Sequence, residues 1–108
     1  MREGLYKVHF RTPRGEGAGV VVIAGGRVRG GDSLMYYVGD YKLEDGQFSA
    51  DIAVDVYARF AAVQSVLGMD RAIIHLSGPT TDDAAQLDGR VNDAAMVSFH
   101  ANLTLLDG

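Results

Sequence analysis

Short runs of alternating polar and apolar residues, separated by turn dipeptides, are the feature that most limits how this chain can fold. Successive side chains of a β-strand point to opposite faces, so such a run predicts a strand with one buried face. Gly25-Gly26 and Asp45-Gly46 are dipeptides that tolerate the positive φ angles of two-residue hairpin loops. The clearest run is 47–57, where one face carries Phe48, Ala50, Ile52, Val54 and Val56.

The same pattern along the whole chain predicts about eight strands. Tyrosines are expected on both faces of one of them, with Tyr36 on one face and Tyr37 and Tyr41 on the other. A short helix or helical turn is predicted near 57–67, where apolar residues recur at helical spacing before Gly68. The predicted strands are 4–11, 18–24, 27–29, 34–41, 47–57, 72–77, 85–91 and 95–106, with loops or turns at 12–17, 78–83 and 92–93 and a turn or bulge at 30–33.

This arrangement predicts an all-β fold, a small eight-stranded antiparallel barrel that forms a single domain over 1–108. A chain of hairpins with a long last strand can pair that strand with the first one, which removes the exposed edges of an open sheet. A barrel of about eight strands is either filled by its own side chains or holds one small ligand.

Composition narrows the classes of function. The chain has no cysteine, which excludes disulfides, a thiolate nucleophile and Cys-ligated zinc. Its net charge of −4 and dispersed Lys and Arg residues argue against direct nucleic-acid binding. The longest apolar run, 18–24, is much shorter than the roughly 20 residues of a membrane-spanning helix. We therefore expect a cytoplasmic protein that binds neither nucleic acid nor a membrane.

Catalytic, metal and cofactor sites are not predicted. His9, His75 and His100 lie on different predicted strands and lack the spacing of metal ligands, although convergence in space stays open. Asp51 and Asp55 share a strand face about 13 Å apart, too far for two carboxylates to share a proton. The glycine pairs lack the lysine and the following helix of a phosphate-binding loop, so turn glycines are the better interpretation.

Several segments together resemble the GrlR-like family, small bacterial proteins named after a negative regulator of type III secretion. The resemblance is best over 4–57, and its most specific part is Gly30-Gly31-Asp32 followed by Tyr36 or Tyr37 and Gly39. The segments that carry it read GLYKVHF (4–10), GAGVVV (17–22), GGRVRGGDSLMYYVGDY (25–41), a DG turn (45–46) and FSADIAVDVY (48–57), with looser matches at 65–68 and 75–78.

The resemblance implies a lipocalin-like barrel that forms a homodimer and regulates by binding a protein, such as a basic transcriptional activator, without chemistry. In the founding regulator an acidic Glu-Asp-Glu-Asp run follows the tyrosine-bearing strand. Here only Glu44 and Asp45 match that run, because Gly46 and Gln47 replace the second acidic pair. Two carboxylates attract a basic surface more weakly than four, so the partner can differ from the family example.

Two functions therefore stay open on the sequence alone. One is regulation through a protein partner held at Glu44 and Asp45, and the other is carriage of one small apolar ligand inside the barrel. Core packing is the default role of the large side chains between the predicted turns at 30–33 and 45–46, and a cavity lining or a subunit interface is the alternative. These residues are Leu34, Met35, Tyr36, Tyr37 and Tyr41.

Overall fold

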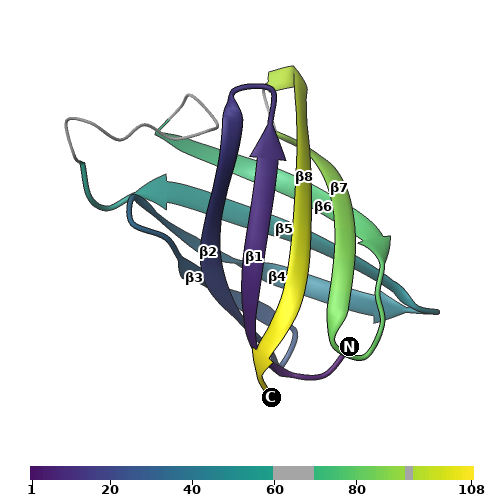
Figure 1. Cartoon of the computed structure of the whole chain (residues 1–108). Coiled ribbons are helices and arrows are strands. Elements are labelled where there is room, and N and C mark those ends of the chain that lie inside the picture. Colours follow the sequence, from purple (N-terminus) through teal and green to yellow (C-terminus); the bar gives the residue numbers. More distant parts are fainter. Residues whose placement is uncertain (60–69, 92–93) are drawn as a thin grey trace.

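The computed structural model describes residues 1–59, 70–91 and 94–108, without the side chains of 94–97. These residues form one closed antiparallel barrel in which each strand pairs with the next, and the last strand pairs with the first (Figure 1). The predicted fold class is thus confirmed. The strands are β1 (Gly4–Thr12), β2 (Gly15–Ala24), β3 (Arg27–Gly31), β4 (Met35–Glu44), β5 (Gln47–Val56), β6 (Arg71–Pro79), β7 (Ala84–Val91) and β8 (Ala94–Asp107).

Alternation decides which side chains enter the barrel. Along β5 every second residue from Phe48 to Val54 is buried, while the residues between them are exposed. Tyr37 is buried and Tyr36 is exposed, so the predicted division of tyrosines between the faces of β4 is confirmed. Among the described side chains the interior is consequently apolar along the strands, except for the buried Thr12 at the end of β1.

One end of the barrel is packed with aromatic side chains. Tyr6 is fully buried there, and its hydroxyl donates a hydrogen bond to the carbonyl oxygen of Arg2 at 2.5 Å. Tyr41 stacks on Phe48 with ring centroids 5.3 Å apart. In Figure 1 this is the lower end, where the chain begins and ends.

Two predicted turns are corrected by the pairing of the strands. Gly30 and Gly31 belong to β3, where they pair with Tyr37 and Tyr36, and the turn begins only at Asp32. The predicted loop 12–17 shortens to a turn at Pro13-Arg14, because β2 already pairs with β1 from Gly15. In both places the glycines lie inside a paired strand. The local sequence alone does not distinguish such a glycine from one that forms a turn.

Glycine is required where neighbouring strands come very close. A Cβ on Gly39 would lie 2.1 Å from the carbonyl oxygen of Asp51, and one on Gly89 would lie 2.0 Å from that of His75. Neither position has an unusual φ angle, so the requirement is one of space. Such glycines allow the strong strand coiling that a small barrel needs.

The predicted hairpin turn at Asp45-Gly46 has φ angles of 52° and 75°, as a two-residue loop of this type requires. The predicted helix near 57–67 is not present over 57–59, which has no regular secondary structure, and its remainder lies outside the described residues. Over the described ranges, no helix is long and apolar enough to cross a membrane.

Candidate functional site

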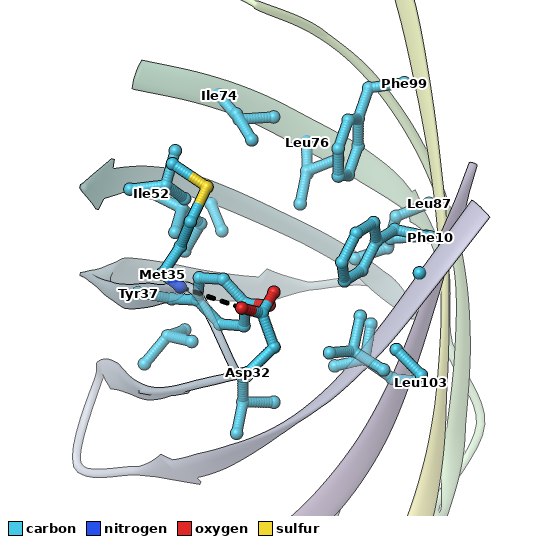
Figure 2. Close-up of a pocket in the computed structure, with 18 of the residues that line it drawn as sticks. Phe10, Asp32, Met35, Tyr37, Ile52, Ile74, Leu76, Leu87, Phe99 and Leu103 are labelled. Carbon is cyan, nitrogen blue, oxygen red and sulfur yellow. Dashed lines mark hydrogen bonds between the residues drawn. The ribbon is translucent and has the colours of Figure 1, made fainter. Parts of the chain in front are cut away.

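The interior of the barrel contains an apolar cavity of about 230 Å³ that is partly open to solvent (Figure 2). All eight strands contribute to its wall, which contains both aromatic and aliphatic side chains. Phe10 and Phe99 stack with ring centroids 5.9 Å apart, and Phe10 meets Tyr37 edge to face at 6.4 Å. The apolar side chains of the wall are those of Val8, Phe10, Val21, Ile23, Val28, Leu34, Met35, Phe48, Ala50, Ile52, Val54, Ile74, Leu76, Leu87, Phe99, Ala101 and Leu103.

The cavity exists in part because two inward positions of its wall carry only a methyl group. These are Ala50 on β5 and Ala101 on β8. The inward glycines of β2 do not add to the open space, because the Phe10 ring covers Gly17, where a Cβ would lie 2.6 Å from it, and Tyr37 covers Gly19. Space that larger side chains at the two alanine positions would fill therefore stays open.

Asp32 and Tyr37 form the central polar part of the cavity wall, with Ser33 beside them and Glu16 at the border. Asp32 lies just after β3, and its carboxylate accepts a hydrogen bond from the hydroxyl of Tyr37. The same carboxylate accepts the backbone N–H groups of Leu34 and Met35, each at 2.8 Å. Figure 2 shows the Tyr37 ring and the Asp32 carboxylate meeting at the edge of the apolar space. We call this the Asp32/Tyr37 pair.

Burial and the neighbouring carboxylate decide the protonation of Tyr37. Burial, followed by the hydrogen bond to Asp32 and the negative charge of Asp32, raises the pKa of the Tyr37 phenol above its ordinary value. The phenol therefore stays protonated and donates its proton to Asp32. The Tyr37 hydroxyl thus has no proton left to donate, and the Asp32/Tyr37 pair offers the cavity only hydrogen-bond acceptors, the lone pairs of its oxygens.

The loop that carries Asp32 is anchored to the chain after β5. The Tyr57 hydroxyl donates to the carbonyl oxygen of Asp32 at 2.5 Å, and the Tyr57 N–H donates to that of Leu34 at 2.9 Å. Asp32 also closes its own turn, because its N–H donates to the carbonyl oxygen of Met35 at 2.9 Å. The carboxylate is thus held in a fixed place at the cavity wall.

The five residues proposed from sequence as core, cavity or interface fall into three groups. Leu34, Met35 and Tyr37 line the cavity. Tyr36 is 43% exposed on the outer surface. Tyr41 belongs to the packed end described above, where it stacks on Phe48. Leu34 and Met35 are buried, so they do not supply an exposed interface.

The acidic pair proposed to bind a partner lies at the far tip of the β4–β5 hairpin. Glu44 and Asp45 are both exposed, as is Leu43 beside them. Figure 1 shows this hairpin extending beyond the body of the barrel. The tip therefore lies away from the cavity, and the structure does not bring Glu44 and Asp45 together with Asp32.

Each histidine has a carboxylate beside it on the outside of the barrel. His75 lies 2.5 Å from Asp51, His9 lies 3.2 Å from Glu16, and His100 pairs with Asp88. These partners come from neighbouring strands, so they were not visible as neighbours in the sequence. Among the described residues, no three His, Asp or Glu side chains gather as a metal site would require.

The outer surface also carries an apolar stripe across strands β2 to β6. Cross-strand pairing joins Val38 to Ala53 and Ala53 to Ile73, while Arg29 separates Val22 from Val38. We call this the outer stripe, and its members are Val20, Val22, Tyr36, Val38, Ala53 and Ile73. Val22 and Ile73 are 45% and 44% exposed.

The Asp32/Tyr37 pair was not foreseen from sequence, where Asp32 was treated as part of a turn. One signal was available, because an Asp that starts a turn often accepts the N–H group two residues later. The pairing with Tyr37 depends on how β3 and β4 coil around the barrel.

No protein-family model matches the chain. No curated protein shows significant similarity to it. The resemblance to the GrlR-like family therefore stays a prediction that depends on the motifs of the first half of the chain.

Proposed function

We propose that this protein is a non-enzymatic binding protein that holds one small, largely apolar molecule inside its barrel. The observation that carries the proposal is the apolar cavity of the barrel, whose few polar groups gather around the Asp32/Tyr37 pair and Ser33, with Glu16 at the border. Sites for small molecules are typically concave and apolar with a few placed polar groups that orient the ligand. This cavity has that composition.

Cavity size limits the ligand. An apolar protein cavity of about 150 Å³ binds benzene. The cavity of about 230 Å³ here is larger. A molecule of roughly ten non-hydrogen atoms therefore fits within this volume.

The test is calorimetric titration of the protein with 1-octanol, together with a variant that fills the cavity. Ala50 lines the cavity, so Ala50→Leu adds three carbon atoms to the space that the ligand needs. Ser49 is exposed on the outer face of the same strand and lies outside the outer stripe, so Ser49→Leu is the control. We expect binding to the original protein and the control, and at least about tenfold weaker binding to Ala50→Leu. Absence of binding to the original protein would contradict the proposal.

A second function, regulation by contact with a basic protein such as a transcriptional activator, is favoured by the exposed hairpin tip. Glu44 and Asp45 place two carboxylates on a projecting turn, where they steer a positively charged surface towards the protein. The resemblance to the GrlR-like family supports the same role. Reversal of both charges, Glu44→Lys with Asp45→Lys, is expected to abolish capture of a basic partner. Reversal of Asp107→Lys, at the far end of β8, is the control.

The homodimer that the resemblance implies is expected to form through the outer stripe. Exposed apolar residues that adjoin one another on a soluble protein commonly mark a contact surface. Sedimentation velocity of the double variant Val22→Lys, Ile73→Lys should show a monomer, while Leu106→Lys, which changes an exposed apolar residue outside the stripe, should leave the dimer intact. A monomeric original protein would contradict this expectation.

A further inference from the structure

We infer that the cavity selects an apolar molecule whose polar end is a hydrogen-bond donor with a positive charge, that is, an alkyl or arylalkyl ammonium ion, and that it discriminates against carboxylates. The inference rests on the proposed function, since it specifies the ligand of the same cavity. It depends on two features of the wall: its charge, and the direction of its hydrogen bonds.

The charge of the wall is negative. Asp32 is half-buried and contributes its carboxylate to the cavity. Glu16 borders the cavity as well, but its side chain is 60% exposed and pairs with His9 on the outer surface. A ligand inside the barrel therefore meets one fixed negative charge, at Asp32.

No positive charge of the chain balances Asp32 within the cavity. None of the ten Lys and Arg residues, and none of the three His residues, contributes to the described wall. The segments 60–69 and 92–97 contain no Lys, Arg or His, so they supply no cation either. A carboxylate ligand would place a second negative charge near Asp32 in a site of low dielectric constant, where like charges repel strongly.

The hydrogen bonds at the polar pair point in one direction. The Tyr37 hydroxyl, the Leu34 N–H and the Met35 N–H all donate to Asp32. A carboxylate only accepts hydrogen bonds, and the Tyr37 hydroxyl has already used its one proton. The pair thus offers acceptors to a ligand, and an ammonium group supplies three donors and the opposite charge.

The experiment compares three ligands that share one chain and differ in the polar end: octylammonium, 1-octanol and octanoate. Each is titrated calorimetrically into the protein at pH 7.5, below the concentration at which it aggregates. We expect octylammonium to bind at least about tenfold more tightly than octanoate, with 1-octanol between them. Equal or tighter binding of octanoate in the original protein would overturn the inference without recourse to any variant.

Asp32→Asn tests the origin of the preference, because the amide keeps an acceptor oxygen for the two N–H groups and removes the charge. The ratio between octylammonium and octanoate is expected to fall to within about threefold, while binding of 1-octanol changes little. Asp40→Asn is the matched control, since Asp40 is an exposed carboxylate that pairs with Arg27 on the outer surface. That variant should keep the original ratio. An unchanged ratio in Asp32→Asn would overturn the inference.

The outcomes separate this inference from the proposed function. If none of the three ligands binds, or if Ala50→Leu binds all of them as the original protein does, the cavity is not the binding site and the proposed function fails. If all three bind equally and Ala50→Leu weakens all of them, the proposed function stands and only the inferred ligand class fails.

Discussion

Asp32 and Tyr37 show how one turn residue can organise a barrel wall. Three donors converge on the Asp32 carboxylate, one from a side chain on β4 and two from the backbone at the start of that strand. A buried Tyr hydroxyl needs a partner, and a charged partner gives a stronger hydrogen bond than a neutral one. The pair thus fixes the entry of β4 and supplies the polarity of the cavity.

Tyr37→Phe should lower the free energy of unfolding by about 1.5–3 kcal/mol at pH 7, because Asp32 loses a charge-assisted hydrogen bond. Urea denaturation followed by circular dichroism measures the change. Tyr36→Phe is the control, since Tyr36 is exposed on the same strand and its hydroxyl faces solvent. An equal loss in both variants would show that the hydrogen bond to Asp32 is not the cause.

The raised pKa of Tyr37 also predicts how stability depends on pH. A phenol whose pKa is higher in the folded than in the unfolded chain holds its proton more firmly in the folded state. Its stabilising effect is complete below the unfolded pKa of about 10 and is lost as the pH rises above it. Urea denaturation between pH 8 and pH 11 should show a decline above about pH 10 that is smaller in Tyr37→Phe.

At the scale of the strand, glycine at inward positions governs curvature. Gly89→Ala would place a methyl group 2.0 Å from the carbonyl oxygen of His75, so β6 and β7 would have to separate. The expected loss in unfolding free energy is about 1–3 kcal/mol, measured by urea denaturation. Gln86→Ala, at an exposed outward position of the same strand, is expected to change stability by less than about 0.5 kcal/mol.

Sequence was a good guide to the strands because alternation is a local signal. The inward residues of β5 and the division of Tyr36 from Tyr37 followed directly from the period of two. Local composition misled at Gly30-Gly31, because a glycine that permits close packing and a glycine that permits a turn have the same letter.

The candidate site was less predictable than the fold, because its contacts cross between strands. The role of Asp32 depends on the position of the Tyr37 hydroxyl, and His75 meets Asp51 only through the register of β5 with β6. The cavity itself depends on the summed volume of the inward side chains of all eight strands. Small inward residues such as Ala50 and Ala101 suggest open space only once all eight strands are in register.

For the molecule as a whole, the pairing of β1 with β8 brings the two ends of the chain together. A Cβ on Gly4 would lie 2.5 Å from the carbonyl oxygen of Asp107, which shows how close these ends are. A circular permutant that joins residues 1 and 108 by a short glycine-serine linker, with new ends between Gly25 and Gly26, should therefore fold to the same barrel. The backbone hydrogen bonds of that turn, from the Gly25 N–H to the Glu3 carboxylate and from the Tyr41 N–H to the Gly26 carbonyl oxygen, lie on either side of the cut and do not depend on the peptide bond between the two glycines.

The permutant is checked by its circular dichroism spectrum, its urea denaturation and its affinity for 1-octanol. We expect the same spectrum, an unfolding free energy within about 2 kcal/mol of the original, and ligand binding if the original binds. A permutant opened inside β5, between Ile52 and Ala53, is the control and should not fold, since it cuts a strand whose side chains fill the core. Folding of both permutants, or of neither, would contradict the inference that the two chain ends can be joined without disturbing the barrel.

Closure of the barrel also limits the way in which another polypeptide can bind to it. In an open sheet, the outermost strand offers free N–H and C=O groups to which an extended peptide adds as a new strand. Here each strand has a neighbour on both sides over part of its length, and β2 lacks a β3 partner only before Val20. A protein that docks on this barrel is therefore expected to recognise mainly side chains and surface shape, and its affinity will be sensitive to single substitutions on the outer face.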